Sequence, residues 1–154
     1  MTNIMSKELY LKLKNQLFLL EKEISSNIED ISDARSKGDL KENSEYSAAK
    51  SKEHILKKEM QRLQQIIKTA KVVDISLKDT VSFGVTVLLE DMDKNESLEY
   101  TIVNEEEVNI KEGKIAYTSI IARNIINKKK GDICIFKVPI GEKKYLIKDF
   151  YIKE

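Results

Sequence analysis

The chain has 154 residues and carries 27 Lys and Arg against 26 Asp and Glu, a formal net charge of +1. This balance excludes a global electrostatic field that would hold the whole protein on nucleic acid or on an anionic membrane. A single cysteine, Cys134, and a single histidine, His54, exclude an internal disulfide framework and a zinc site built from several such ligands.

Glycine and proline divide the sequence into two parts. Gly38 is the only such residue before position 84. The other four glycines, starting with Gly84, and Pro139 lie in the second part. The sequence therefore predicts two domains, 1–75 and 76–154. No run of about 18 uncharged apolar residues occurs, and we expect neither a signal peptide nor a membrane span. With one cysteine, the expected compartment is the reducing cytoplasm.

Apolar residues in the first part recur at alternating steps of three and four, which is the heptad pattern of a coiled coil. The first run is Tyr10, Leu13, Leu17, Leu20, Ile24, Ile31 and Ala34, interrupted by Asn27. The second run is Tyr46, Ala49, Leu56, Met60, Leu63, Ile67 and Ala70, interrupted by Glu53. Two helices of matched length, each roughly 40 to 45 Å long, predict an antiparallel coiled-coil hairpin that projects from the second domain.

The second part changes to β-branched runs separated by turn residues, which predicts a mostly antiparallel sheet. The expected strands are Val72–Ile75, Val81–Leu89, Leu98–Val103, Gly113–Tyr117, Ile133–Val138 and Tyr145–Ile152. Ser119 precedes an apolar pattern that runs to Asn127, so one short helix is expected to pack on this sheet. The predicted fold class is therefore α+β, with an N-terminal helical hairpin and a C-terminal β-sheet domain.

The segment between the two long helices has two interpretations. Gly38 suits a helix C-cap, and Asp39 with Glu42 three residues later forms a capping box for the next helix. The same spacing at a helix start lets both carboxylates point the same way, where they could complete the ligand shell of Mg²⁺. The sequence leaves both interpretations open.

The run Ala-Arg-x-x-Gly-Asp-Leu-Lys-Glu-Asn-Ser-Glu-Tyr-x-Ala-Ala-Lys, residues 34–50, resembles the tip signature of Gre-type bacterial transcript-cleavage factors. Residues 83–87, 110–115 and 121–123 resemble the C-terminal domain of the same family. The resemblance thus covers the whole chain. It implies that the second domain has an FKBP-like fold.

The resemblance implies a monomeric partner of bacterial RNA polymerase, whose hairpin enters the secondary channel of the enzyme. There it would stimulate the polymerase to cleave backtracked RNA near the extruded 3′ end. Asp39 and Glu42 would assist a Mg²⁺ ion shared with the polymerase, and no cofactor would be bound stably. Asn43 and Tyr46 would support the tip, and Lys50 would contact the RNA.

The resemblance also implies that the second domain docks on the polymerase through residues 119–123. These are Ser119, Ile120, Ile121, Ala122 and Arg123. The family usually has proline where this chain has Ile120, and an Arg-Pro pair near Ser25-Ser26-Asn27. The first departure falls in the docking region, whereas the second changes a helix where proline would cause a bend.

Three alternatives remain open on the sequence. Some relatives occupy the same channel and inhibit the polymerase, but they carry a differently arranged acidic cluster. An FKBP-like prolyl isomerase would use a pocket lined with aromatics including Trp, and this chain has no Trp. A structural adaptor would dimerise through the coiled coil. The motifs Gly-x-Ser-x-Gly, the P-loop and Gly-x-Gly-x-x-Gly are absent, so we expect no independent enzymatic activity.

Overall fold

The computed structural model describes residues 3–38 and 44–153 of the chain. Asp39, Glu42 and Asn43 lie outside the described residues. The chain forms two compact units, Met1–Val72 and Val73–Glu154. The first is built on two long helices and the second on a β-sheet with a short helix, so the predicted α+β class is confirmed.

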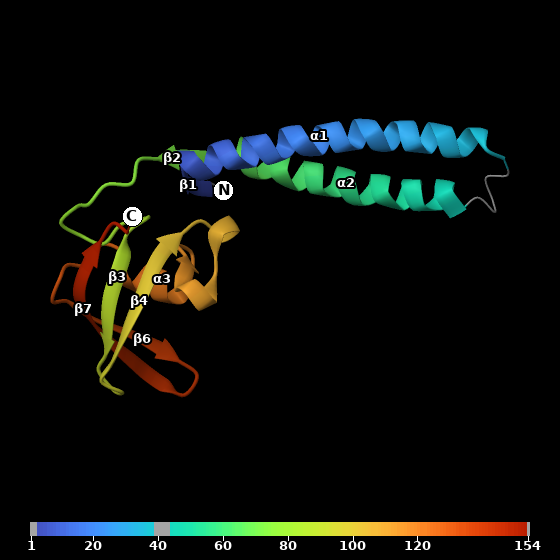
Figure 1. Cartoon of the computed structure of the whole chain (residues 1–154). Helices are drawn as coiled ribbons and strands as arrows, with labels where there is room; N and C mark the ends of the chain where they lie inside the picture. Colours follow the sequence, from blue (N-terminus) through green and yellow to red (C-terminus); the bar gives the residue numbers. More distant parts are fainter. Residues whose placement is uncertain (1–2, 39–43, 154) are drawn as a thin grey trace. The chain divides into compact units, whose positions relative to one another are not determined.

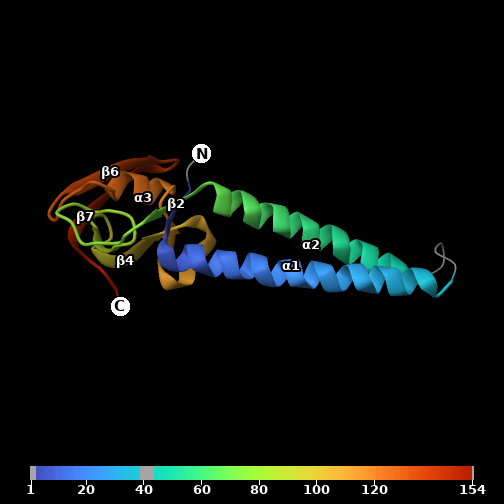
Figure 2. The same ribbon diagram turned by 90° about the horizontal axis from the view of Figure 1, so that it is seen from above.

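The first unit is a helical hairpin. Helix α1 (Lys7–Ser36) and helix α2 (Ser44–Lys68) run side by side in both views of the ribbon (Figure 1, Figure 2). Helix α1 starts after Ser6, whose hydroxyl accepts a hydrogen bond from the Leu9 amide at 3.1 Å. This bond satisfies one of the amide groups that a helix start leaves unpaired.

The heptad seams are confirmed as the face along which the helices meet. The buried residues of α1 are Leu9, Leu13, Asn27, Ile31 and Ala34. Those of α2 are Ala49, Leu56 and Leu63. Tyr10, Leu17, Leu20 and Ile67 are half-buried and pack against a cluster at the base of the hairpin. The apolar stripe is therefore narrow, as the two seams predicted.

A short ribbon at the base of the hairpin was not predicted. Strand β1 (Asn3–Ser6) pairs with strand β2 (Ala70–Val73) in a two-stranded sheet of their own. The predicted strand over Val72–Ile75 is therefore wrong in its bounds, and it does not belong to the larger sheet to which it was assigned. Met5 of β1 is fully buried and joins Leu9, Leu13 and Leu63 in the base cluster.

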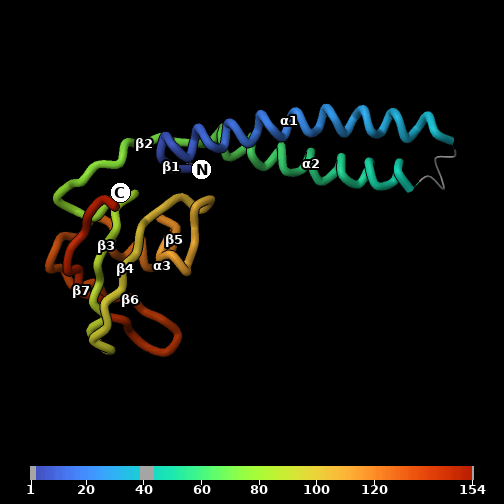
Figure 3. Tube along the Cα trace, viewed as in Figure 1, coloured from blue at the N-terminus to red at the C-terminus, as the bar shows by residue number. Residues whose placement is uncertain are grey.

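The second unit contains a five-stranded sheet with the order β5-β4-β3-β7-β6, whose path is followed in the Cα trace (Figure 3). Its strands are β3 (Thr86–Asp91), β4 (Glu96–Val103), β5 (Lys114–Ala116), β6 (Ile133–Val138) and β7 (Gly141–Tyr151). Two short 3-10 helices, Glu105–Glu107 and Ile110–Glu112, lie between β4 and β5 along the chain. Helix α3 (Ile120–Ile125) follows β5.

The sheet is antiparallel except at β5, which pairs in parallel with β4. Strand β3 begins later than the predicted Val81, because the chain turns at Gly84, where φ is +90°. Its pairing with β7 also shifts between Leu88 and Leu89, the signature of a β-bulge.

Alternate residues of the strands form one core with α3. The buried members are Val81, Val85, Val87, Leu89, Ile102, Ile115, Ala122, Ile125, Cys134, Phe136, Tyr145 and Ile147. Cys134 is 3% exposed, and burial raises the pKa of its thiol above the ordinary value of 9.0. A buried thiol with a raised pKa is a poor nucleophile.

Gly113 sits where no other residue fits. Its φ is +73°, in the left-handed region, and a Cβ atom there would lie 2.5 Å from the backbone oxygen of Glu99. The close approach allows the Thr101 amide to donate to the Gly113 carbonyl at 2.8 Å. Gly113 therefore permits the tight entry into β5.

Candidate functional site

The first candidate region is the end of the hairpin where the helices approach residues 39–43. Helix α1 ends at Ser36, and the amide of Lys37 donates to the Ala34 carbonyl at 3.2 Å. Gly38 has a φ of +137°, which glycine adopts far more readily than other residues. The predicted site residues Asp39, Glu42 and Asn43 fall in the segment that the structure does not describe. Their capping and metal-binding roles therefore stay predictions.

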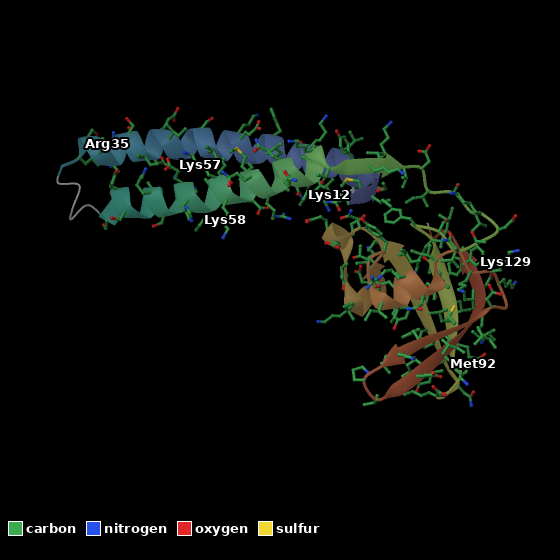
Figure 4. All side chains as sticks on the ribbon, turned by 180° about the vertical axis from the view of Figure 1, so that it is seen from behind. Lys12, Arg35, Lys57, Lys58, Met92 and Lys129 are labelled. Atoms are coloured by element: carbon green, nitrogen blue, oxygen red, sulfur yellow. The ribbon has the colours of Figure 1, made fainter. Side chains whose placement is uncertain are left out.

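Tyr46 lies in the first turn of α2 and is half-buried. The guanidinium of Arg35 is 5.9 Å from the centre of the Tyr46 ring, within the range of a cation–π contact. Arg35 itself is labelled near the distal end of α1 (Figure 4). A second contact joins Lys37 Nζ to Glu45 Oε2 at 3.3 Å. Both contacts connect the last turn of α1 and its cap to the first turn of α2.

Lys50 lies on the exposed side of α2 and is ion-paired. Its Nζ is 3.0 Å from Glu53 Oε1, and Lys57 Nζ is 3.9 Å from the other oxygen of the same carboxylate. The hydrogen bond from Lys50 lowers the pKa of Glu53 below its ordinary value of 4.5. Lys50 is thus a cation with an exchangeable partner, as a phosphate contact requires.

Further basic residues follow Lys50 along α2, and Figure 4 labels two of them, Lys57 and Lys58. Lys52 Nζ lies 3.7 Å from Glu23 on α1. Arg62 forms a two-bond pair with Glu59 at 2.8 and 3.0 Å. These exposed pairs neutralise part of the basic face without burying it, so its charges can still exchange partners.

Metal ligands do not gather within residues 3–38 and 44–153. No group of three or more His, Cys, Asp or Glu side chains there could hold a metal ion. In the same ranges, no helix is long and apolar enough to cross a membrane.

The second candidate region is an apolar groove of about 530 Å³ in the β-sheet unit. It is lined by residues of the segment before β5, of α3 and of strands β5 to β7. These are Val108, Ile110, Ile115, Ala116, Ser119, Ile120, Ile121, Phe136, Val138, Lys143 and Tyr145. Exposed apolar area of this kind marks a surface suited to a partner.

The groove contains three of the five predicted docking residues. Ser119 caps α3 by accepting a hydrogen bond from the Ala122 amide at 3.2 Å, and Ile120 and Ile121 follow it. Ile120 is 58% exposed. Ala122 is fully buried in the core, and Arg123 is exposed but does not line the groove.

The other residues that line the groove were not predicted from the sequence. Val108 and Ile110 are exposed apolar residues at the ends of the two 3-10 helices, and Phe136 and Tyr145 come from neighbouring strands. Val108 and Ile110 lie between two charged runs in the sequence. This apolar pair was the one local feature that could have indicated the groove. The strand residues carried no such signal, because their alternation only predicts a core.

Two polar side chains that line the groove, Lys143 and Tyr145, interact with the carboxylate of Asp91. Lys143 Nζ lies 3.8 Å from Asp91 Oδ2, and Asp91 is only 4% exposed. Burial raises the pKa of Tyr145 above its ordinary value of 10.0, and the charge of Asp91 adds to that effect. The Tyr145 hydroxyl therefore remains protonated and able to donate at neutral pH.

Comparison with known proteins identifies the family. Residues 3–72 match the family model described as "Transcription elongation factor, N-terminal". Residues 76–151 match the model described as "Transcription elongation factor, GreA/GreB, C-term". The chain belongs to the GreA/GreB family of transcription elongation factors, which confirms the resemblance seen in residues 34–50.

Individual relatives are similar to this chain over nearly its whole length. The transcription elongation factor GreA of Trichlorobacter lovleyi is 43% identical over 93% of this chain and 92% of its own. That of Anaeromyxobacter sp. (strain K) is 39% identical over 93% of this chain and 88% of its own. The crystal structure of GreA factor homolog 1 (Gfh1) from Thermus thermophilus is 20% identical, covers 98% of this chain and 99% of that chain, and has a TM-score of 0.48.

Proposed function

We propose that this protein stimulates the cleavage of backtracked RNA by bacterial RNA polymerase and so rescues arrested elongation complexes. The polymerase performs the hydrolysis, and this chain contributes residues to the enzyme's active site. The observation that carries the proposal is the sequence Asp39-Leu40-Lys41-Glu42 between the two helices of a hairpin, in a chain of the GreA/GreB family.

The dimensions of the hairpin support entry into a deep channel. Helix α1 contains 30 residues, which corresponds to about 45 Å at 1.5 Å per residue. A narrow pair of helices of this length can carry a short segment to the bottom of the polymerase secondary channel. We therefore assign delivery of residues 39–43 to the hairpin.

The acidic residues of that segment fit the chemistry of a shared Mg²⁺ ion. Mg²⁺ prefers carboxylate, water and phosphate oxygens and is commonly held by one or two carboxylates. Asp39 and Glu42 would supply such oxygens, with Asn43 and Tyr46 supporting the segment. When bound by both proteins, Mg²⁺ would stabilise the charge that develops as water attacks the phosphodiester. The protein alone is not expected to bind the ion stably.

Lys50 would contact the extruded 3′ segment of the RNA. In the free protein its ammonium is held by Glu53 at 3.0 Å, on the exposed side of α2. A phosphate oxygen could replace that carboxylate, and Glu53 would keep Lys57 as its partner at 3.9 Å. The exchange makes the contact reversible, as a factor that acts on many complexes requires.

The second domain, 76–154 in the sequence-based division, would dock on the outer rim of the channel through the apolar groove. Ser119, Ile120 and Ile121 line it, Ala122 anchors α3 in the core, and Arg123 offers an exposed charge. An exposed isoleucine at position 120 preserves an apolar contact where the family usually has proline. Because docking uses one copy of each domain, the protein is expected to act as a monomer.

The test is a cleavage assay on stalled, backtracked bacterial elongation complexes with labelled RNA. Wild-type protein in Mg²⁺ should shorten the RNA, whereas Asp39→Ala protein and buffer should not. Binding of wild-type protein without cleavage would overturn the proposal in favour of a channel inhibitor. Absence of binding would overturn it in favour of an adaptor or an isomerase, and light scattering would distinguish a coiled-coil dimer.

A further inference from the structure

A polar side chain is buried in the core of the hairpin. Asn27 of α1 is 1% exposed and occupies the seam between Ile24 and Ile31. Its Nδ2 donates a hydrogen bond to the backbone oxygen of Ala49 on α2 at 3.1 Å. The bond joins residues 22 positions apart and crosses from one helix to the other.

The amide is only partly satisfied. Its Oδ1 is buried and has no hydrogen-bond partner in the described part of the chain. A buried acceptor without a donor is unfavourable, and an apolar side chain of similar size would be free of that penalty. Asn27 therefore favours one alignment of the two helices but does not add to the net stability of the hairpin.

The two ends of the hairpin are held together differently. At the base, Met5, Leu9, Leu13 and Leu63 form a buried apolar cluster beside the β1/β2 ribbon. Toward the distal end, the buried residues include Ala34 and Ala49, whose side chains are small. Small residues make few contacts that depend on alignment, so a directional hydrogen bond matters most in this half.

The leucines of the seam select the alignment of the helices only in part. Leu13 and Leu63 lie equally far from Gly38 along the chain, as do Leu20 and Leu56, and also Asn27 and Ala49. A shift of one heptad would keep one leucine pair, Leu20 with Leu63, and would place Leu13 opposite Ala70. It would also place Asn27 opposite Leu56, whose larger side chain would block the approach to the backbone that Ala49 permits.

We propose that Asn27 is a positioning residue, which aligns the distal halves of α1 and α2 and thereby places residues 39–43 for the cleavage reaction. This inference rests on the proposed function and deepens it. In coiled coils, a single buried asparagine can fix register at the expense of stability. Here the amide fixes the part of the hairpin that lies far from the apolar base.

The decisive variant is Asn27→Leu, because leucine is close to asparagine in size but cannot form the hydrogen bond. The groove of about 390 Å³ at this position has Ala34, Ala48 and Ala49 as its apolar lining and is otherwise lined by charged residues, Asp30, Asp33, Lys37, Glu45 and Lys52. The variant should unfold at a higher temperature than wild type. It should nevertheless stimulate RNA cleavage at least about fivefold less, the effect of losing ~1 kcal/mol of alignment. Ile24→Leu, at the neighbouring seam position, is the matched control and should change neither property.

Alignment is measured directly with pairs of spin labels in a Cys134→Ala background. Labels at Glu29→Cys and Ser47→Cys report on the distal half, and labels at Asn15→Cys and Gln61→Cys report on the base. All four positions are exposed. In Asn27→Leu the distal distance distribution should broaden or split, while the distribution at the base stays as narrow as in wild type.

A distal distribution as narrow as in wild type, or undiminished cleavage by the more stable variant, would overturn the positioning role. A purely structural role predicts that activity follows stability, which is the opposite result. If wild-type protein stimulated no cleavage, the proposed function would fail. The label distances would still decide whether Asn27 aligns the two helices.

Discussion

The Lys50 ammonium lies 3.0 Å from Oε1 of Glu53, a half-buried carboxylate one turn further along α2. This hydrogen bond is the main reason that the pKa of Glu53 lies below 4.5, because it outweighs the opposing effect of desolvation. The attraction of Lys57, at 3.9 Å from the other carboxylate oxygen, adds to the shift. The proposed RNA contact and this internal pair therefore compete for the same cation.

Lys50→Met should raise the pKa of Glu53 toward its ordinary value, because the substitution removes the hydrogen bond and an attractive charge. NMR titration of the Glu53 carboxyl carbon measures the shift. Lys57→Met is the matched control and should raise the pKa less, since that ammonium is farther away. An equal rise in both variants would contradict the dominance of the Lys50 hydrogen bond.

Lys50→Ala should raise the protein concentration that gives half-maximal stimulation of cleavage. This increase should be larger at low salt than at high salt. Each phosphate contact releases counterions, so its removal lowers the salt dependence of binding by about one ion. The measurement is the half-saturating protein concentration at several salt concentrations. Lys58→Ala, at another exposed position of α2, is the control for the loss of one positive charge from the helix. A loss that is independent of salt would point to altered packing instead.

Ile120→Ser should weaken binding to RNA polymerase roughly tenfold, because it removes ~1.4 kcal/mol or more of apolar contact in the groove. Ile140→Ser is the control, since Ile140 is 93% exposed and does not line the groove. Titration of polymerase with fluorescently labelled protein compares the two variants. Equal affinities for both variants would show that the groove is not the docking surface.

Gly113→Ala should destabilise the β-sheet unit by about 2 kcal/mol or more, through its left-handed backbone and the close Glu99 carbonyl. Denaturant unfolding of the full chain, followed by a probe in that unit, measures the change. Gly131→Ala separates the two causes, because Gly131 has a similar φ of +93° but has nothing within 4 Å of the added Cβ. Equal losses would contradict a steric role of the Glu99 carbonyl.

Asp91 should make the β-sheet unit less stable in acid. Burial opposes ionisation of its carboxyl, but hydrogen bonds from the Lys94 and Asp93 amides and the charge of Lys143 hold its pKa below 3.8. A carboxyl with a lowered pKa stabilises the folded state above its unfolded pKa, and this contribution is lost as the pH falls through the folded value. Asp91→Asn should therefore lower the midpoint of thermal unfolding at neutral pH and have less effect in acid. Asp93→Asn, in the exposed part of the same turn, is the control for the loss of one negative charge, because it leaves the Asp91 carboxylate and its amide hydrogen bonds in place.

Heptad spacing sufficed to predict the hairpin, because the burial of a helix face leaves a repeat that is readable in one sequence. The run 34–50 similarly identified the family. The β1/β2 ribbon was not predictable in this way, since Asn3–Ser6 pairs with a partner more than 60 residues away. Its four residues carry no alternation that distinguishes a strand from a helix start.

The groove shows a second limit of sequence analysis. Ser119 to Ile121 could be singled out as a motif, but Phe136 and Tyr145 acquire their place only when β6 pairs with β7. The bond from Asn27 to Ala49 is a similar case. The interruption of the seam was visible in the sequence, whereas the partner of the amide depends on how the two helices align.

The ribbon beneath the hairpin also has a mechanical consequence. Over a lever about 45 Å long, a tilt of only ~5° at its foot displaces the far end by ~4 Å, more than the length of a hydrogen bond. Met5 of β1 is fully buried against Leu9, Leu13 and Leu63, so it anchors the ribbon to the foot of both helices. A small change at the four residues of β1 is therefore amplified at the opposite end of the helices.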